Sequence, residues 1–217
     1  MSAVSVTLKI ATSLDGRIAL ADGTSQWITG SDARARSHQM RAAHDAVLVG
    51  VGTVLADDPL LTARIVPLPE KQPARIVMDS AGRTPPECRL VRSTAVGRVV
   101  IATAGTSAPW LSAEGAEVWD CGEQDGQVEP HRVLERCTVE GISSVMVEGG
   151  GMVAASFLRA GLVSRIEWFR APILIGGDGL PAIGALGLIE MSGAARWRAV
   201  ATERIGNDVL ESYVKVE

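Results

Sequence analysis

The chain has 217 residues, of which 47% are apolar and 21% are charged, and its formal net charge is −4. A chain of this size can bury a substantial core, and we expect residues 1–217 to form a single domain. The slight acidity and the lack of a Lys/Arg-rich run argue against nucleic acid as a partner. No segment approaches the roughly 20 apolar residues that span a bilayer, which argues against a membrane protein.

The cysteines argue against two further classes of protein. Cys88, Cys121 and Cys137 are odd in number and show no CxxC spacing, so neither a disulfide framework nor a zinc site is expected. The segment 1–16 has no early basic region, and its apolar residues alternate with polar ones as in a strand. We therefore expect a cytoplasmic protein without a metal.

The first two thirds of the chain alternate between predicted strands and helices. Residues 4–10 alternate between apolar and polar side chains, which predicts a strand. A helix is predicted to begin with Ser31 or Asp32 as its N-cap and to end near Ala43. Short apolar runs predict buried strands at 46–49, 75–79, 98–102 and 143–147, the last followed by a helix at 152–160.

The last third has a different pattern. Residues 166–171, 196–201 and 209–216 read as strands joined by Gly-rich loops rather than by helices. Helices between the early strands and loops between the late ones predict an α/β fold. Its central sheet would be mostly parallel, with antiparallel edge strands and flanking helices. The polar stretch 106–130 is expected to be variable surface.

A triple glycine gives the strongest signal for a ligand site. Glu148-Gly149-Gly150-Gly151 joins the end of a predicted buried strand to the start of a predicted helix. In that order the backbone N–H groups and the helix N-terminus can hold an anion, and glycine lets a pyrophosphate approach closely. The alternative is a plain tight turn.

A second glycine turn lies earlier, at 50–59. Gly50-Val51-Gly52 resembles the start of a dinucleotide fingerprint, but Leu55 stands where the third glycine is expected. A plain strand-to-helix turn explains it about as well. The carboxylates of Asp57 and Asp58 could accept hydrogen bonds from ribose or amide groups, or be surface charge.

The polar stretch 13–30 contains one aromatic candidate. Trp27 could stack on a flat ring, and the alternative is a partly buried core indole. The histidines at 38, 44 and 131 show no ligand spacing and are given no role. These features together predict a soluble α/β protein with a nucleotide-sized anionic ligand, but they name no reaction.

Several motifs resemble those of one family. The most specific are SLDGR at 13–17, SQWIT at 25–29 and TVLADDPLLTAR at 53–64. In the same order come DAVLVG at 45–50, RIVMD at 75–79, VEGG at 147–150 and PILIGGD at 172–178. The chain thereby resembles, over nearly its whole length, the reductase domain of the bifunctional riboflavin-biosynthesis deaminase–reductase.

That resemblance implies a dihydrofolate-reductase-like fold, NADPH as hydride donor, and a homodimer. The implied reaction turns the ribosyl group of 5-amino-6-(5-phosphoribosylamino)uracil into a ribityl group. Hydride adds to C1′ of the opened sugar and a proton is delivered to nitrogen.

By position, the resemblance also implies the site residues. The cofactor is expected at Ala11, Trp27, Thr53, Asp57, Ser80, Gly150, Gly151, Met152, Val153, Ala154, Ala155 and Ser156. The substrate is expected at Ser25, Arg41, Leu61, Arg64 and Glu148. Arg41 and Arg64 suit phosphate, because guanidinium matches phosphate oxygens bidentately. Lys9, Asp57 and Glu148 are the candidate proton donors, with bound water as a further possibility.

One departure concerns the deaminase. The HxE and PCxxC pattern of its zinc site is absent, so we expect a stand-alone reductase. Such a protein can act instead on the 2,5-diaminopyrimidinone analogue or on dihydrofolate. A phosphate-free substrate would not need both Arg41 and Arg64. A non-catalytic NADP-binding module is the third alternative.

Overall fold

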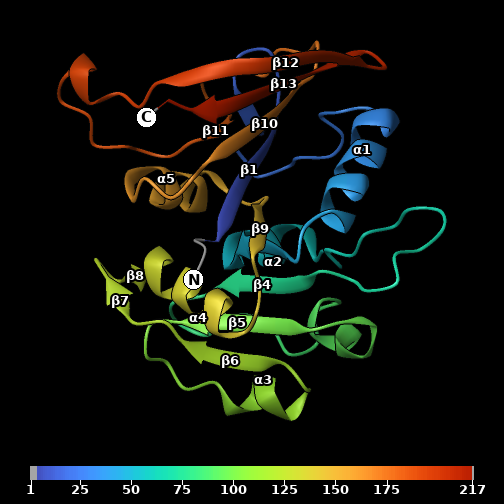
Figure 1. The fold of residues 1–217 in the computed structure, drawn as a ribbon, viewed down its shortest axis with the longest axis vertical. Helices are drawn as coiled ribbons and strands as arrows, with labels where there is room; N and C mark the ends of the chain where they lie inside the picture. The colour runs from blue at the N-terminus through green and yellow to red at the C-terminus, as the bar shows by residue number, and fades with distance from the viewer. Residues whose placement is uncertain (1–3, 217) are drawn as a thin grey trace.

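The structure is a computed structural model, and it describes residues 4–216 (Figure 1). Most of the predicted strands and helices are present within two or three residues of the expected bounds. The helices are α1 (Ser31–Ala42), α2 (Val51–Asp57), η1 (Val91–Val96), α3 (Pro109–Ala113), α4 (Pro130–Val139), α5 (Gly151–Arg159) and η2 (Met191–Gly193). The strands are β1 (Ser5–Thr12), β2 (Arg17–Ala19), β3 (Ala46–Gly50), β4 (Ala74–Met78), β5 (Val99–Thr103), β6 (Glu117–Asp120), β7 (Glu123–Gln124), β8 (Gln127–Val128), β9 (Ser144–Val147), β10 (Arg165–Arg170), β11 (Leu180–Pro181), β12 (Trp197–Ile205) and β13 (Asp208–Lys215).

A nine-stranded sheet organises the chain, in the order β12-β13-β10-β1-β9-β3-β4-β5-β6. The seven strands from β10 to β6 pair in parallel. Strands β13 and β12 pair antiparallel at one edge. The predicted fold class, a mostly parallel sheet with antiparallel edge strands and flanking helices, is confirmed.

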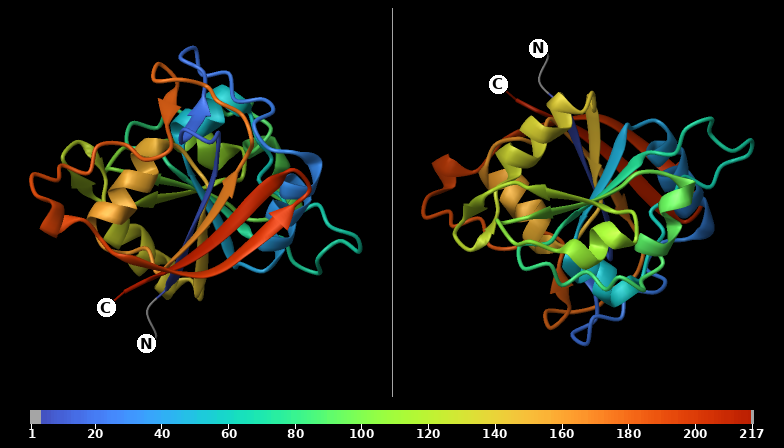
Figure 2. Two further views of the ribbon diagram at one scale, coloured as in Figure 1. Left: turned by 90° about the horizontal axis from the view of Figure 1, so that it is seen from above. Right: turned by 90° about the horizontal axis from the view of Figure 1, so that it is seen from below.

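The apolar runs become the middle of this sheet because both of its faces are covered. Every residue of β3, β4 and β5 is buried. Helices α4 and α5 cover one face, and α2, α3 and η1 cover the other (Figure 2). Helix α1 lies on the face of α2, where its Ala33 packs with Phe169 of β10 and Leu210 of β13.

Strand β9 is inserted between β1 and β3, although it comes late in the chain. The carboxyl ends of β1, β9, β3 and β4 therefore lie side by side at one edge of the sheet. In open parallel sheets, ligands bind in the crevice outside these ends. Within residues 4–216, no helix is long and apolar enough to cross a membrane.

The predicted N-cap of α1 is wrong. The N-cap is Gly30, and no side chain of the helix itself caps the first turn. The Asp208 carboxylate accepts a hydrogen bond from the Gly30 N–H at 2.7 Å instead. A residue from the far end of the chain thus holds the backbone at the N-cap, while no side chain within residues 4–216 accepts the N–H groups of the first turn.

The stretch 106–130 is more than variable surface. It contains β6, the ninth strand of the main sheet, whose Trp119 is buried. The late strand predicted at 166–171 is present as β10, which pairs on both sides and so has no free edge. The free edge at that end of the sheet belongs to β12.

Candidate active site

The candidate site starts from the register of three neighbouring strands. Leu8 of β1 and Leu48 of β3 both pair with Val147 of β9. The next residue, Glu148, donates its N–H to the Leu48 carbonyl at 2.9 Å, so the pairing continues past the end of β9. Lys9 and Glu148 therefore stand at the same level of the sheet, because residues in register point to the same face.

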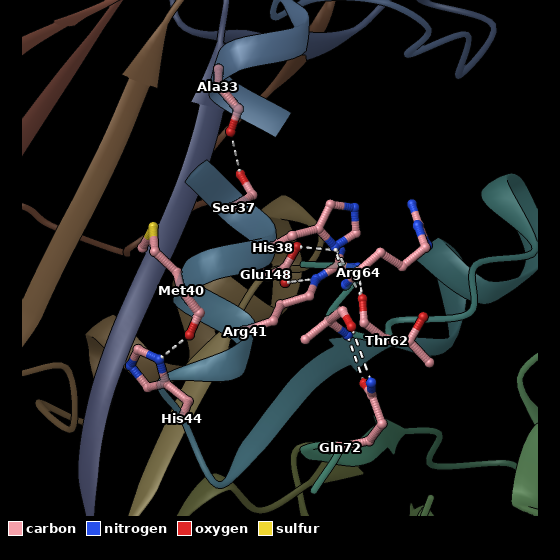
Figure 3. A network of polar contacts seen from close by, with 11 residues as sticks. Ala33, Ser37, His38, Met40, Arg41, His44, Thr62, Arg64, Gln72 and Glu148 are labelled. Carbon is pink, nitrogen blue, oxygen red and sulfur yellow. Dashed lines mark hydrogen bonds and ion pairs between the residues drawn. The ribbon is translucent and has the colours of Figure 1, made fainter. Parts of the chain in front are cut away.

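Arg41 reaches Glu148 from the third turn of α1. Its Nε lies 2.5 Å from Oε1, and its Nη2 lies 2.9 Å from Oε2 (Figure 3). The Nη1 atom donates to the Thr62 carbonyl at 3.1 Å. The side chains are only 14% and 7% exposed, so this is a buried bidentate ion pair. Such a pair ties α1, β9 and the segment after α2 to one another.

The charges around Glu148 fix its protonation state. Burial alone would raise the pKa of Glu148, but the Arg41 guanidinium, its hydrogen bonds and the Lys9 ammonium hold that pKa at about 2. Burial lowers the pKa of Lys9, and the Glu148 carboxylate partly opposes that effect. At neutral pH Glu148 is therefore an acceptor, while the Lys9 ammonium gives up its proton more readily than an exposed lysine.

Asp57, the third candidate proton donor, lies apart from that ion pair. Its exposed carboxylate accepts a hydrogen bond from the Ser25 hydroxyl at 3.2 Å. Two predicted site residues, one for substrate and one for cofactor, thus meet although 32 positions separate them. Lys9 stands in register with Glu148, so it is the stronger candidate for delivering a proton.

His38 belongs to the site, although no sequence pattern predicted it. Its Nδ1 atom lies 3.1 Å from the Thr62 carbonyl oxygen and 3.2 Å from the Arg64 backbone nitrogen (Figure 3). Between them, Ala63 exchanges two hydrogen bonds with the Gln72 side chain, at 2.8 and 3.0 Å. The signal that could have found His38 is its spacing, because residues 38 and 41 share one face of a helix.

Arg64 has a charged group with no counter-ion. Its side chain is exposed, and it forms no ion pair with any residue between 4 and 216. Partial burial lowers its pKa, and the nearby cations of Arg41 and Arg89 lower it further. Since Glu148 already occupies the fork of Arg41, Arg64 is the better phosphate partner of the two arginines predicted for that role.

The two glycine turns pack against each other. A Cβ on Gly149 would lie 2.8 Å from the Cβ of Val49, and one on Gly50 would lie 2.7 Å from Cγ2 of Val153. Real Cβ atoms do not approach so closely, so only glycine permits this contact. The β3–α2 and β9–α5 turns are thereby held side by side.

Both turns end in a helix N-terminus that no side chain caps. The N-cap of α5, Gly150, has φ 66° and ψ 138°, a conformation that favours glycine. The first helical hydrogen bond of α5 runs from Ala154 N–H to the Gly150 carbonyl. The N–H groups of Gly151, Met152 and Val153 are therefore available, and such groups fit a pyrophosphate.

Other predicted cofactor residues differ in what they can offer. The side chains of Ala154 and Ala155 are buried in the core, and the Ser156 hydroxyl donates to the Val153 carbonyl at 2.8 Å. The Ser80 hydroxyl accepts the Val128 N–H at 3.0 Å. Ala11 of β1 is partly buried. On the cofactor side of the α5 turn, the accessible groups are thus those of 150–153.

The remaining predicted residues are Thr53, Trp27 and Leu61. Thr53 lies next to Gly150, since its Oγ1 is 3.8 Å from where a Cβ on that glycine would stand. Trp27 is 70% exposed, with the Arg34 guanidinium 4.4 Å from its ring, so the alternative of a core indole is wrong. Leu61 has its side chain in the core, which leaves only its backbone for a ligand.

Comparisons with known proteins match the chain to one family. The model of the RibD C-terminal domain matches residues 4–210. The riboflavin biosynthesis protein RibD of Actinobacillus pleuropneumoniae is 38% identical over 97% of this chain, which spans 57% of that protein. The 2,5-diamino-6-ribosylamino-4(3H)-pyrimidinone 5′-phosphate reductase of Methanothermobacter thermautotrophicus is also 38% identical, over 96% of each chain.

Solved structures agree with the fold. RibD of Acinetobacter baumannii superposes with a TM-score of 0.87 at 27% identity, covering 99% of this chain and 58% of that one. The Saccharomyces cerevisiae riboflavin biosynthesis reductase Rib7 gives a TM-score of 0.78 at 22% identity, covering 99% and 90%. The chain therefore spans only 58% of the Acinetobacter RibD chain and 57% of the Actinobacillus protein.

Proposed function

Because the chain belongs to the RibD C-terminal domain family, we propose that it is a reductase of riboflavin biosynthesis that uses NADPH to reduce a ribosylaminopyrimidine phosphate. One observation carries the proposal. The carboxylate of the buried Arg41–Glu148 pair follows the end of β9, and Lys9 stands at the same level of β1. The uncapped glycine turn before α5 begins at the next residue, and Arg64 lies on the segment that Arg41 contacts at Thr62. The site thus combines a hydrogen-bond acceptor, a proton source, N–H groups that fit an anion, and a cation with no ion-pair partner among residues 4–216.

The substrate would be held at both of its ends. Each Glu148 oxygen accepts one hydrogen bond from Arg41 and has lone-pair capacity left for the amino groups of a pyrimidine or the hydroxyls of its sugar. The Arg64 guanidinium would bind the 5′-phosphate bidentately. Ser25, held by Asp57, would add a further hydroxyl contact. Binding at two ends positions the sugar carbon between them.

The cofactor would lie along the two glycine turns. The N–H groups at the start of α5 and α2 suit its pyrophosphate, and Thr53 stands between the turns. Trp27 offers an exposed indole for stacking. When bound, a reduced nicotinamide supplies the hydride that this reaction needs.

The chain's own part in the chemistry is proton delivery. When hydride adds to C1′ of the open imine form, the electron pair of the C=N bond moves to nitrogen, which then takes a proton. Lys9 is the group we assign to deliver it, because burial has already lowered its pKa. Glu148 stays ionised beside it, so a fresh proton from water restores the ammonium after each turnover.

We place 5-amino-6-(5-phosphoribosylamino)uracil first, because the motifs of the chain resemble those of the reductase domain that acts on it. Its 2,5-diamino analogue comes second, because the Methanothermobacter protein, matched over 96% of each chain, is named for that compound. The two compounds differ at the ring and not at the phosphate. Dihydrofolate is third, because it gives the unpaired Arg64 no phosphate to bind.

We further propose a homodimer and a cytoplasmic location. The free edge of β12 and the partly exposed Val200 on it suit contact with a second copy. All three cysteines are free and buried, as suits a reducing compartment. Light scattering of the purified protein tests the dimer.

The test of the function follows the oxidation of NADPH by its absorbance. Purified protein is mixed with NADPH and, in parallel, with 5-amino-6-(5-phosphoribosylamino)uracil, its 2,5-diamino analogue and dihydrofolate. We expect turnover of a pyrimidine phosphate, with KM raised about 10- to 100-fold in Arg64→Ala, the worth of a charged hydrogen bond. Arg204→Ala, which removes an exposed arginine on β12, is the control. Turnover of dihydrofolate alone would overturn the substrate assignment.

A further inference from the structure

No single protonation state of His38 satisfies both of the backbone groups that lie next to its Nδ1 atom. Its Nδ1 is within hydrogen-bonding distance of an obligate acceptor, the Thr62 carbonyl, and of an obligate donor, the Arg64 N–H. An imidazole nitrogen either carries a proton or accepts one, so only one of these contacts is satisfied at a time. With a proton on Nδ1 the ring donates to Thr62, and without it the ring accepts from Arg64.

The other ring nitrogen is free in both cases. No residue between 4 and 216 forms a hydrogen bond with Nε2 of His38. Figure 3 shows that this nitrogen points away from the Thr62–Arg64 backbone, while the side chain of Arg64 also extends away from the ion pair. The imidazolium form would present an Nε2–H donor beside a segment whose own cation has no counter-ion.

The groups facing His38 come from three parts of the chain. Arg41 lies one turn further along α1, Arg64 lies on the segment after α2, and Glu148 follows β9. Burial lowers the pKa of His38, the two arginines lower it further, and the Thr62 carbonyl and Glu148 oppose them. An added anion would tip this balance, since it would offset the arginine cations.

We propose that His38 is part of the phosphate-binding site and that it takes up a proton when the substrate's phosphate binds. This inference rests on the proposed function, because it takes the ligand of Arg64 to be a phosphate. The imidazolium donates Nδ1–H to Thr62 and Nε2–H to a phosphate oxygen. Binding therefore resolves the conflict at Nδ1 in favour of the carbonyl.

The proposal makes substrate affinity depend on pH through His38. A ligand that favours the protonated ring binds tightest below the pKa of the free protein, and its affinity falls as the pH rises from that value to the higher pKa of the complex. The phosphate itself has a second pKa near about 6 and works in the opposite direction at low pH. The histidine's share is isolated by comparison with a variant that lacks the imidazole.

The first experiment reads the histidine directly. The chain has three histidines, and their ring signals are titrated by NMR with and without ribose 5-phosphate, using His38→Asn to assign them. We expect the pKa of His38 to rise by about one unit on binding, as an opposite charge at close range requires. His44 is the matched control, because its nitrogens already meet Met40 and Thr7 at 2.7 and 3.0 Å.

The second experiment separates a binding role from a merely structural one. In His38→Asn we expect KM for the pyrimidine phosphate to rise about 10- to 100-fold, the worth of a charge-assisted hydrogen bond, with kcat nearly unchanged. The fall in affinity with rising pH should disappear. His38→Gln, which keeps a neutral donor near Nε2, should recover part of the affinity without the pH dependence.

The outcomes distinguish this inference from the function on which it rests. If ribose 5-phosphate competes with the substrate but the pKa of His38 stays fixed, the inference is wrong and the function stands. The inference is also wrong if the substrate is reduced and His38→Asn leaves both KM and its pH profile unchanged. If neither pyrimidine phosphate is reduced and ribose 5-phosphate does not bind, both proposals fail together.

Discussion

Two buried arginines in this molecule are treated in different ways. Arg41 meets the carboxylate of Glu148 in a bidentate ion pair. Arg75 of β4 is fully buried and pairs with no carboxylate between residues 4 and 216. Its guanidinium donates to neutral groups, namely the Ser93 hydroxyl at 2.6 Å and the carbonyls of Ser93, Gly97 and Leu60.

The difference separates a buried arginine that serves the fold from one that belongs to the candidate active site. Arg75 shows that this fold can bury a guanidinium with only neutral oxygens as partners, so a buried arginine here does not require a carboxylate. A buried ion pair is in any case weak evidence for stability, because desolvation offsets the attraction. Glu148 beside Arg41 therefore points to a second role, that of an acceptor for a ligand.

The largest effect is expected from Glu148→Gln. The neutral amide leaves Arg41 and Lys9 without their counter-charge and weakens the acceptor, so we expect kcat/KM for the substrate to fall by about 10²- to 10³-fold. Glu117→Gln is the matched control, because Glu117 forms the same bidentate pair with Arg98 away from the site. Steady-state kinetics check both. Equal losses of kcat/KM in the two variants would contradict a ligand-binding role for Glu148.

Arg75→Met should lower the stability of the protein and leave its activity nearly unchanged. It leaves several buried carbonyls without a donor, and we expect a loss of about 2–4 kcal/mol in the free energy of unfolding. The kcat of the folded protein should stay within about twofold, since the side chain lies outside the site. Urea titration and kinetics measure the two quantities. A large drop in kcat with little loss of stability would show that the contact with Leu60 shapes the site.

A third prediction uses pH. The pKa of Glu148 is about 2 in the folded protein against an ordinary value of 4.5. A depressed pKa gives stability that is fully present above the ordinary value and is lost as the pH falls through the folded one. The unfolding free energy should thus lose this contribution between about pH 4.5 and 2, and Glu148→Gln should remove that part of the slope. An unchanged slope would contradict the assignment.

The smallest effect is expected from Gly52→Ala in α2. A Cβ there meets no atom within 4 Å, so alanine should stabilise the helix by about 0.5–1 kcal/mol. If the N-terminus of α2 binds the cofactor, the same methyl group should weaken NADPH binding. Thermal unfolding and fluorescence titration test the two effects. Higher stability with unchanged NADPH affinity would show that α5 alone supplies the N–H groups for the cofactor's pyrophosphate.

The sequence predicted the elements whose signal is local. Apolar runs gave β3, β4 and β5, and the triple glycine marked the turn before α5. The predictions of the strands and of this turn succeed because burial on both faces and tight turns restrict which residues are allowed. Of the site, the motifs brought forward Arg41, Arg64 and Glu148, whose roles stay predictions.

What the sequence could not predict depends on partners far along the chain. Asp208 binds the N-cap residue Gly30 of α1 from the last hairpin, which no local pattern at Ser31 reveals. Strand β6 is short and bounded by charged residues, so its apolar content resembles that of a loop. His38 joins the site only because Thr62 and Arg64 fold back onto α1. The position of Glu148 likewise decides that Arg41 forms the ion pair and that Arg64 keeps its guanidinium for a ligand.

The place of β9 has a consequence for how the protein is made. Strands β1 and β3 are synthesised early, yet neither pairs with the other, because β9 fills the gap between them. A chain that has grown only to residue 143 therefore carries two strands with unsatisfied edges, a state that promotes aggregation. Long-range parallel pairing is also slow. We expect fragments that end before Ser144 to be insoluble, and the sheet to close only after the ribosome has delivered the C-terminal third.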